Sequence, residues 1–198
     1  VPVSAKESPI LQGNIVADRY REDPASLDTN GDGVVSYVLL EGESSHQDSL
    51  IRTEWSIRTL KDAGVPIERI TGGIANWAGS QASALMEQWL LEYPDTIELV
   101  ICNNDDMAIG ALQAIQAAGR TVNEDIYLVG VDALDAALNE VVAGNMTGTV
   151  LNDANGQATQ AVASMEDLLG GKTFAAGEQS IYVDYVKVTP ENAQEYIK

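Results

Sequence analysis

The sequence predicts an α/β protein, with an open, doubly wound parallel sheet that carries helices on both faces. Short apolar runs rich in Val, Ile and Leu alternate along the chain with segments whose apolar residues recur at helical spacing. This alternation is typical of right-handed βαβ units, whose strands are buried on both faces. The chain has 198 residues, which is enough to bury a sizeable core.

The expected strands are short apolar runs close to Gly or Asn. In chain order they are residues 35–40, 67–74, 99–101, 127–131 and 149–151. Helical patterns separate them, at residues 51–60, 85–90 and 107–115. Gly64 and Pro66 end the first helix and Gly119 ends the third, because glycine favours the conformation just past a helix and proline cannot continue one.

The last part of the chain has a different pattern. Residues 158–169 carry an apolar stripe at helical spacing, and the pair Gly170 and Gly171 ends that helix. Residues 181–188 then alternate in polarity, which indicates a strand at a sheet edge. A short helix is expected after Pro190.

The composition argues against several classes of function. The chain has 30 acidic and 11 basic residues and a net charge of -19, which disfavours nucleic acid and anionic membrane as partners. No apolar run approaches the ~18 residues of a spanning helix. A single cysteine, Cys102, and a single histidine, His46, leave no internal disulfide and no site rich in Cys or His. The sequence contains no nucleophile elbow and no phosphate-binding Gly-rich loop.

The most specific motif is DTNGDGVVS at residues 28–36. Oxygen-bearing side chains recur at every second position and Gly33 permits the tight turn, as in the first part of an EF-hand calcium loop. The candidate ligands are the side chains of Asp28, Asn30, Asp32 and Ser36 and the carbonyl of Val34. The twelfth position is Leu39 rather than Glu, so a bidentate carboxylate comes from elsewhere or the site is weak. The alternative interpretation is an Asx-rich surface turn.

Polar side chains follow the expected strands at the edge where open α/β sheets bind ligands. They are His46, Asp48, Arg52, Trp77, Asn103, Asn104, Asp105, Asp132, Asn152 and Asp153. Carboxylates accept hydrogen bonds from hydroxyls, Arg and Asn donate them, and an aromatic face can cover the apolar face of a sugar ring. The set therefore favours a neutral polyhydroxylated ligand over a phosphate.

Several of these residues also have a purely structural interpretation. Asp105 and Asp153 can cap helices, and Asn103 can satisfy backbone groups. Trp77 can belong to the core, and Cys102 is expected to be an inert buried thiol. The ligand site is therefore inferred from the convergence of the strand ends.

Taken together, these stretches resemble the periplasmic glucose/galactose-binding proteins of bacterial ABC transporters, which have the type I periplasmic-binding-protein fold. The resemblance rests on KESPILQG, DTNGDGVVSYVLLEGE, residues 46–52, IELVICNNDDMAIGA, VGVDAL and GTVLNDAN. It implies that Glu98 supplies the missing calcium carboxylate and that Trp77 stacks on one sugar ring face. It implies a sugar site formed by His46, Asp48, Arg52, Trp77, Asn104, Asp132 and Asn152.

By this resemblance the chain corresponds to the second of two lobes. Residues 1–153 would form the sugar-binding lobe with the calcium loop, residues 154–181 would return to the absent first lobe, and residues 182–198 would return to the second. The apolar stripe at residues 158–169 would then lack its usual partner. We expect that helix either to fold back onto the lobe or to be buried by self-association, because large exposed apolar patches are uncommon on soluble monomers.

The resulting expectation is a non-enzymatic half-site for galactose or glucose that is stabilised by Ca2+. The parent protein would act outside the cytoplasm, in a periplasm or as a surface lipoprotein, and would dock on an ABC permease. Sugar binding by the chain alone should be weak, because pockets normally bury ~70–90% of a ligand. The alternatives are the ligand-binding domain of a sugar-responsive regulator of the lac-repressor type, a sugar-processing enzyme and a structural fragment without a ligand.

Overall fold

The computed structural model describes residues 3–173 and 182–197, apart from the side chains of residues 3 and 4. The elements of this part of the chain are α1 (Val3–Glu22), α2 (Pro24–Leu27), β1 (Val35–Glu41), α3 (Gln47–Asp62), β2 (Ile67–Ile74), α4 (Gly79–Glu92), β3 (Leu99–Cys102), α5 (Asp105–Ala117), β4 (Tyr127–Val129), α6 (Asp135–Val142), β5 (Thr149–Leu151), α7 (Ala154–Leu169), β6 (Val186–Val188) and the 3-10 turn Ala193–Glu195.

The central sheet is parallel, with strand order β2-β1-β3-β4. β5 extends it beside β4 through isolated bridges, Val129 to Gly148 and Asp132 to Leu151, and pairs with β6 in the antiparallel sense. The predicted doubly wound α/β fold is confirmed. The strand expected at residues 127–131 ends earlier, at Val129, and beyond it the amides of Gly130 and Asp132 donate to the carbonyls of Gly148 and Val150.

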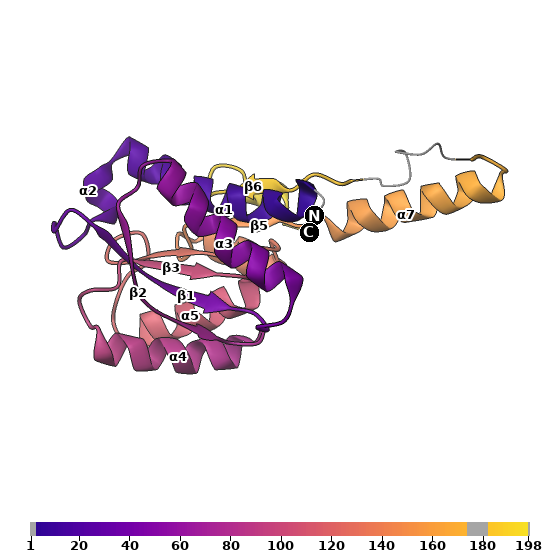
Figure 1. Ribbon diagram of the computed structural model, residues 1–198. Coiled ribbons are helices and arrows are strands. Elements are labelled where there is room, and N and C mark those ends of the chain that lie inside the picture. Colours follow the sequence, from indigo (N-terminus) through magenta and orange to yellow (C-terminus); the bar gives the residue numbers. More distant parts are fainter. Residues whose placement is uncertain (1–2, 174–181, 198) are drawn as a thin grey trace.

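Alternate residues of the strands are buried against opposite layers of helices. Tyr37 and Leu39 of β1 face the core under α1 and α3, whereas Val38 and Leu40 face the core under α4, α5 and α6. Figure 1 shows α1 and α3 on one side of the sheet and α4 and α5 on the other. Burial on both faces explains why these strands have near-continuous apolar sequences.

Helix α1 is a structural element that the sequence analysis did not predict. It contains Pro9 inside the helix and has only a weak apolar face, so its periodicity is hard to recognise. Its second half is nevertheless buried through Ile15 and Val16. The side-chain amide of Gln12 donates to the carbonyls of Cys102, at 2.7 Å, and Gly130, at 3.1 Å, and so joins α1 to the ends of β3 and β4.

Helix α7 lies apart from the rest of the protein (Figure 1). None of the side chains that form it is buried, and Val162, Met165, Leu168 and Leu169 are all more than half exposed. The helix was expected, and Asp153 caps it through the amide of Gly156 at 3.0 Å. Of the two outcomes expected for its apolar stripe, folding back onto the lobe is wrong, and burial by self-association stays a prediction.

Near the C-terminus the predictions hold in part. The strand expected at 181–188 is limited to Val186–Val188 among the described residues, and residue 181 lies outside them. The helix expected after Pro190 is a single 3-10 turn, Ala193–Glu195. Within residues 3–173 and 182–197, no helix combines the length and the apolar character that crossing a membrane requires.

Candidate sugar-binding and calcium sites

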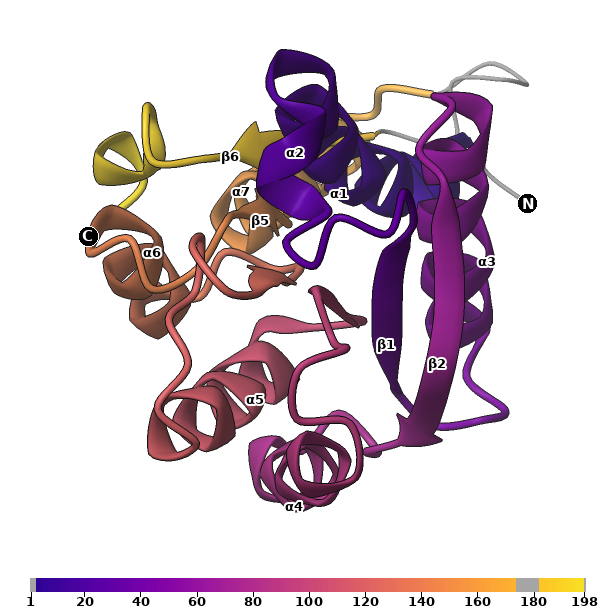
Figure 2. The same ribbon diagram turned by 90° about the vertical axis from the view of Figure 1, so that its left-hand side faces the viewer.

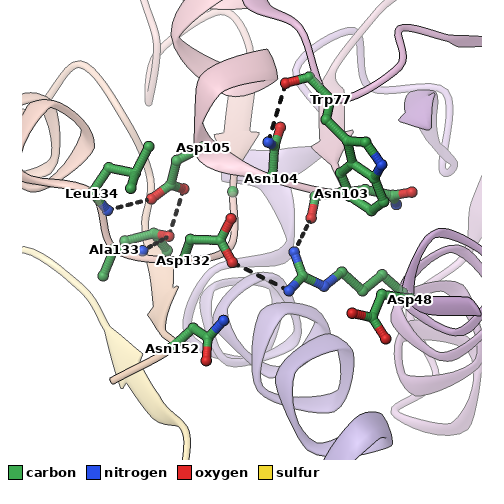
Figure 3. A network of polar contacts seen from close by, with 12 residues as sticks. Asp48, Trp77, Asn103, Asn104, Asp105, Asp132, Ala133, Leu134 and Asn152 are labelled. Carbon is green, nitrogen blue, oxygen red and sulfur yellow. Dashed lines mark hydrogen bonds and ion pairs between the residues drawn. The ribbon is translucent and has the colours of Figure 1, made fainter. Parts of the chain in front are cut away.

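The polar residues predicted from the strand ends gather at the carboxyl edge of the sheet. Figure 3 shows Asp132, Asn152, Asn104, Trp77 and Asp48 around one region. Each of the five follows a different strand of the chain, β1 to β5, and Asp48 lies in the first turn of α3. Figure 2 shows the sheet and its helices from a second direction. Parallel strands bring their carboxyl ends to one edge, which is why residues over a hundred positions apart in sequence meet here.

Arg52 is the central cation of this region. It projects from the second turn of α3, and only 7% of its side chain is exposed. One guanidinium nitrogen donates to the carbonyl of Asn103 at 2.6 Å, and another lies 3.2 Å from a carboxylate oxygen of Asp132. The guanidinium therefore has a fixed direction before any ligand arrives, which lowers the entropy cost of binding a hydroxyl.

Asp132 follows β4 on a left-handed backbone, with a φ of 116°. Burial raises the pKa of its carboxyl group, while Arg52 and the side-chain amide of Asn152 lower it. Because desolvation is the larger effect, the ion pair only partly offsets the cost of burying the charge. A ligand hydroxyl that donates to this carboxylate would add to that compensation.

Trp77 presents a half-buried indole to the same region. The imidazole of His46 meets the ring edge to face, with centroids 5.2 Å apart, and the guanidinium carbon of Arg52 lies 5.8 Å from the ring centroid. Gly42 lies directly against the indole, and a β-carbon there would overlap with the ring. Trp77 is therefore held between neighbours that fix the plane of its ring.

The remaining predicted sugar residues have mixed surroundings. His46 caps α3, since its Nδ1 accepts the amide of Asp48 at 3.2 Å, and Asp48 itself is exposed. Asn104, rather than Asp105, caps α5 by accepting the amide of Met107 at 3.0 Å. Its side-chain amide also donates to the carbonyl of Trp77 at 3.3 Å, which joins two of the predicted positions.

Two residues of this region lie outside the predicted sugar site: Asn103, which the sequence analysis placed in the strand-end set, and Tyr185, which it did not consider. Asn103 is fully buried, and its side-chain oxygen accepts from the amide of Gly42 at 3.1 Å and the hydroxyl of Ser49 at 3.1 Å. Tyr185 lines a cavity of about 380 Å3 beside α7. Burial raises the pKa of its hydroxyl, and the nearby charge of Arg52 lowers it. The motif NNDD pointed to Asn103, but only the folded chain brings Tyr185 from its distant position.

Cys102 agrees with the structural interpretation. It is fully buried at the end of β3, and burial, with a smaller contribution from Asp105, raises the pKa of its thiol well above the ordinary value. The thiolate form is therefore disfavoured, which makes the side chain a poor nucleophile.

The calcium-like loop lies against Glu98, which contacts two of its predicted residues through their backbone amides. The Glu98 side chain is fully buried and accepts the amides of Asn30, at 3.0 Å, and Ser36, at 2.8 Å. Asp28 accepts the amides of Asp32 and Gly33 at 3.0 and 2.9 Å. Within residues 3–173 and 182–197, the structure contains no group of three or more Asp, Glu, His or Cys side chains that is arranged to hold a metal ion. The oxygen-rich donor set suits a hard cation, but several of its oxygens now accept loop amides.

Residues 3–173 match the family described as periplasmic binding protein domain. The chain belongs to this family. It is 34% identical to the D-galactose/methyl-galactoside binding periplasmic protein of Haemophilus influenzae, with 100% of this chain and 60% of that protein aligned. It is 36% identical to a putative rhizopine-binding protein of Rhizobium meliloti over 83% of the chain and 52% of that protein. The chain thus spans about half to three fifths of these relatives.

Solved structures lead to the same family. An ABC transporter solute binding protein from Bacillus halodurans with bound myo-inositol superposes with a TM-score of 0.79 at 30% identity, over 98% of this chain and 61% of that one. A periplasmic solute binding protein from Actinobacillus succinogenes with bound D-allose has a TM-score of 0.80 at 22% identity over 99% and 63%, and so supports the fold alone. These relatives are binding proteins, in agreement with the expected non-enzymatic role.

Proposed function

We propose that the chain is the lobe of an extracytoplasmic monosaccharide-binding protein that serves an ABC transporter, and that it carries half of a hexose site. The observation that supports this is the convergence of Arg52, Asp132 and Trp77 at the carboxyl edge of the sheet. Charged groups that accept and donate hydrogen bonds lie beside an aromatic face, which is the combination that a sugar ring requires.

Each predicted residue has a part in this proposal. Trp77 covers the apolar face of the ring, Asp132 accepts from a hydroxyl, and Arg52 donates to a neighbouring one. The other contributors are His46, Asp48, Asn104 and Asn152. Galactose and glucose are the preferred candidates, because the chain aligns along its whole length with a galactoside-binding relative. The names of the relatives also support a periplasmic setting and a transporter permease as the partner of the whole protein.

The test is a titration of the chain with galactose, glucose and myo-inositol, followed by two-dimensional NMR. We expect weak binding of a hexose, with shifts at Trp77 and Arg52. Asp132→Ala should weaken binding about tenfold or more, because it removes a charged acceptor and the carboxylate that pairs with Arg52. Asp135→Ala, an exposed carboxylate three residues further on, should leave binding unchanged. If saturating sugar shifts the NMR signals of neither Trp77 nor Arg52, the proposal is contradicted.

We also propose that the loop holds Ca2+, with Asp28, Asn30, Asp32, the carbonyl of Val34, Ser36 and Glu98 as ligands. The buried Glu98 supports this, because a carboxylate from a distant strand lies against the loop where the EF-hand pattern lacks its twelfth ligand. Binding would exchange the loop amides on Asp28 and Glu98 for the cation, and would thereby join the loop to β3.

Thermal unfolding with and without Ca2+ tests the calcium proposal. At a calcium concentration one hundred times the Kd, the folded chain should gain about 2.7 kcal/mol and a higher Tm. Glu98→Gln should abolish that gain, whereas Glu124→Gln at an exposed position should preserve it. A Tm that does not change with Ca2+ in the unaltered chain would exclude this site.

A further inference from the structure

A buried carboxylate, Asp105, lies beside the loop that carries Asp132 (Figure 3). Its side chain is fully buried at the first position of α5. One carboxylate oxygen accepts the amide of Leu134 at 2.9 Å, and the other accepts the hydroxyl of Thr149 at 2.6 Å. The amide of Asp105 donates to the carbonyl of Val131 at 2.8 Å. A single residue therefore holds both sides of Asp132 and joins them to β5.

The loop between these contacts has a backbone that needs support. Asp132 has a φ of 116° and Ala133 a φ of 52°, and both residues carry a β-carbon, which disfavours the left-handed region. Gly130 packs so closely against Asp105 that a β-carbon would overlap with the carboxylate. Strained residues of this kind persist only where surrounding contacts determine their conformation, and Asp105 supplies those contacts on either side.

We propose that Asp105 is a positioning residue, whose carboxylate holds the loop of residues 130–134 so that Asp132 points at Arg52 and at the ligand. This inference rests on the proposed sugar-binding function for its consequence, although the contact itself can be tested without sugar. Asp105 does not meet the ligand, because both of its oxygens are occupied and its side chain has no exposed surface. It acts through Asp132, which lies 3.2 Å from Arg52.

Replacing Asp105 by a neutral residue should affect the stability of the fold and the position of the loop of residues 130–134 differently. Burial is the largest effect on this carboxyl group and raises its pKa to about 7, so the charge is unfavourable to the fold at alkaline pH. Asp105→Asn removes that charge with little change of shape. Its amide group can accept from only one of the two donors, Leu134 and Thr149, so the loop loses support while the core keeps its packing.

The experiment compares Asp105→Asn with Asp135→Asn, which alters an exposed carboxylate in the first turn of α6. At pH 8, Asp105→Asn should keep or raise Tm. The Leu134 amide should shift upfield in NMR spectra and exchange about tenfold faster or more, as expected on loss of a charged acceptor. Galactose should bind about tenfold more weakly, with Asp135→Asn unchanged in every measurement.

Two results would overturn the inference. One is a Leu134 amide whose chemical shift and exchange rate are the same in Asp105→Asn as in the unaltered chain. The other is a loss of galactose affinity that is accompanied by a matching loss of Tm. If the unaltered chain binds no hexose, the proposed function fails, and the Leu134 amide alone decides whether Asp105 holds the loop.

If Asp105→Asn does not fold, Thr149→Val replaces it. This change removes the hydroxyl that donates to Asp105 and keeps the shape of the side chain. A two- to fivefold weaker hexose affinity in Thr149→Val would then support the inference, and an unchanged Leu134 amide in that variant would contradict it.

Discussion

The sheet lobe and helix α7 contain the same kinds of apolar residue in contrasting environments. Leu39 of β1 is fully buried between neighbouring strands and helices, whereas Leu168 of α7 is 57% exposed. Both segments follow the hydrophobic pattern of their element, and only the lobe supplies a second layer to cover it. The comparison teaches that periodicity specifies which face of an element is apolar, but not what that face contacts.

The largest expected effect is a difference in unfolding free energy between matched leucine substitutions in the two regions. Leu39→Ala should lower the free energy of unfolding by about 2–5 kcal/mol, because it removes buried contacts and leaves a cavity. Leu168→Ala should change it by less than ~0.5 kcal/mol, as at ordinary surface positions. Urea denaturation monitored by circular dichroism measures both. Equal losses in the two variants would show that α7 is packed in solution.

The second effect concerns how the stability of the sheet lobe depends on pH. The pKa of Asp105 is about 7 in the folded chain against an ordinary value of 3.8, so the folded state retains this proton more strongly than the unfolded state. Its contribution to stability is therefore present at low pH and is lost as the pH rises toward about 7. The groups that face it are the carboxylate of Asp132, which raises its pKa, the thiol of Cys102 and the donors on Thr149 and Leu134.

Denaturation of the unaltered chain and of Asp105→Asn at pH 5 and pH 8 measures this contribution. The unaltered chain should lose roughly 2–3 kcal/mol more than the variant over this interval. The variant provides its own control, because every other carboxylate titrates in both proteins. The prediction fails if the two proteins have parallel pH profiles. Exposed carboxylates on α7 should contribute little to either profile.

A third, smaller effect compares two glycines. Gly42→Ala should displace the indole of Trp77 and cost about 1–3 kcal/mol, since the added β-carbon would overlap with the ring. Gly170→Ala at the end of α7 should be close to neutral, because its φ is -72° and the nearest atom is 3.3 Å from the added carbon. Tryptophan fluorescence and thermal unfolding measure both. An unchanged emission spectrum in Gly42→Ala would indicate that the ring is not held there.

The smallest expected effect on stability lies on α7 itself. Changing Val162 and Met165 together to Ser should leave the unfolding free energy within ~0.5 kcal/mol, because both side chains are more than half exposed. If the apolar stripe is covered by a second copy, the same double variant should shift sedimentation velocity profiles from dimer to monomer. A chain that is monomeric before and after substitution would contradict self-association.

Much of the fold followed from local pattern. The apolar strand sequences, the helix stop at Gly64 and the cap at Asp153 were all predictable, because each depends on a few neighbouring residues. The rule that parallel strands bring their carboxyl ends to one edge also placed Asp132, Arg52 and Trp77 near one another. Helix α1 was missed, because Pro9 and a weak apolar face conceal a helix that tertiary packing stabilises.

The sequence by itself determined the α/β class, the parallel direction of the buried strands and the residue types available at the ligand edge. Only the tertiary structure decided that Asn104 caps α5 while Asp105 turns inward to Leu134 and Thr149, although the two are neighbours in one polar run. It also decided that Tyr185 reaches Arg52 and that α7 remains uncovered. The physical reason is the range of the interactions. Periodicity and caps act within a turn or a strand, whereas burial and the partner of a charge depend on segments brought together by the whole fold.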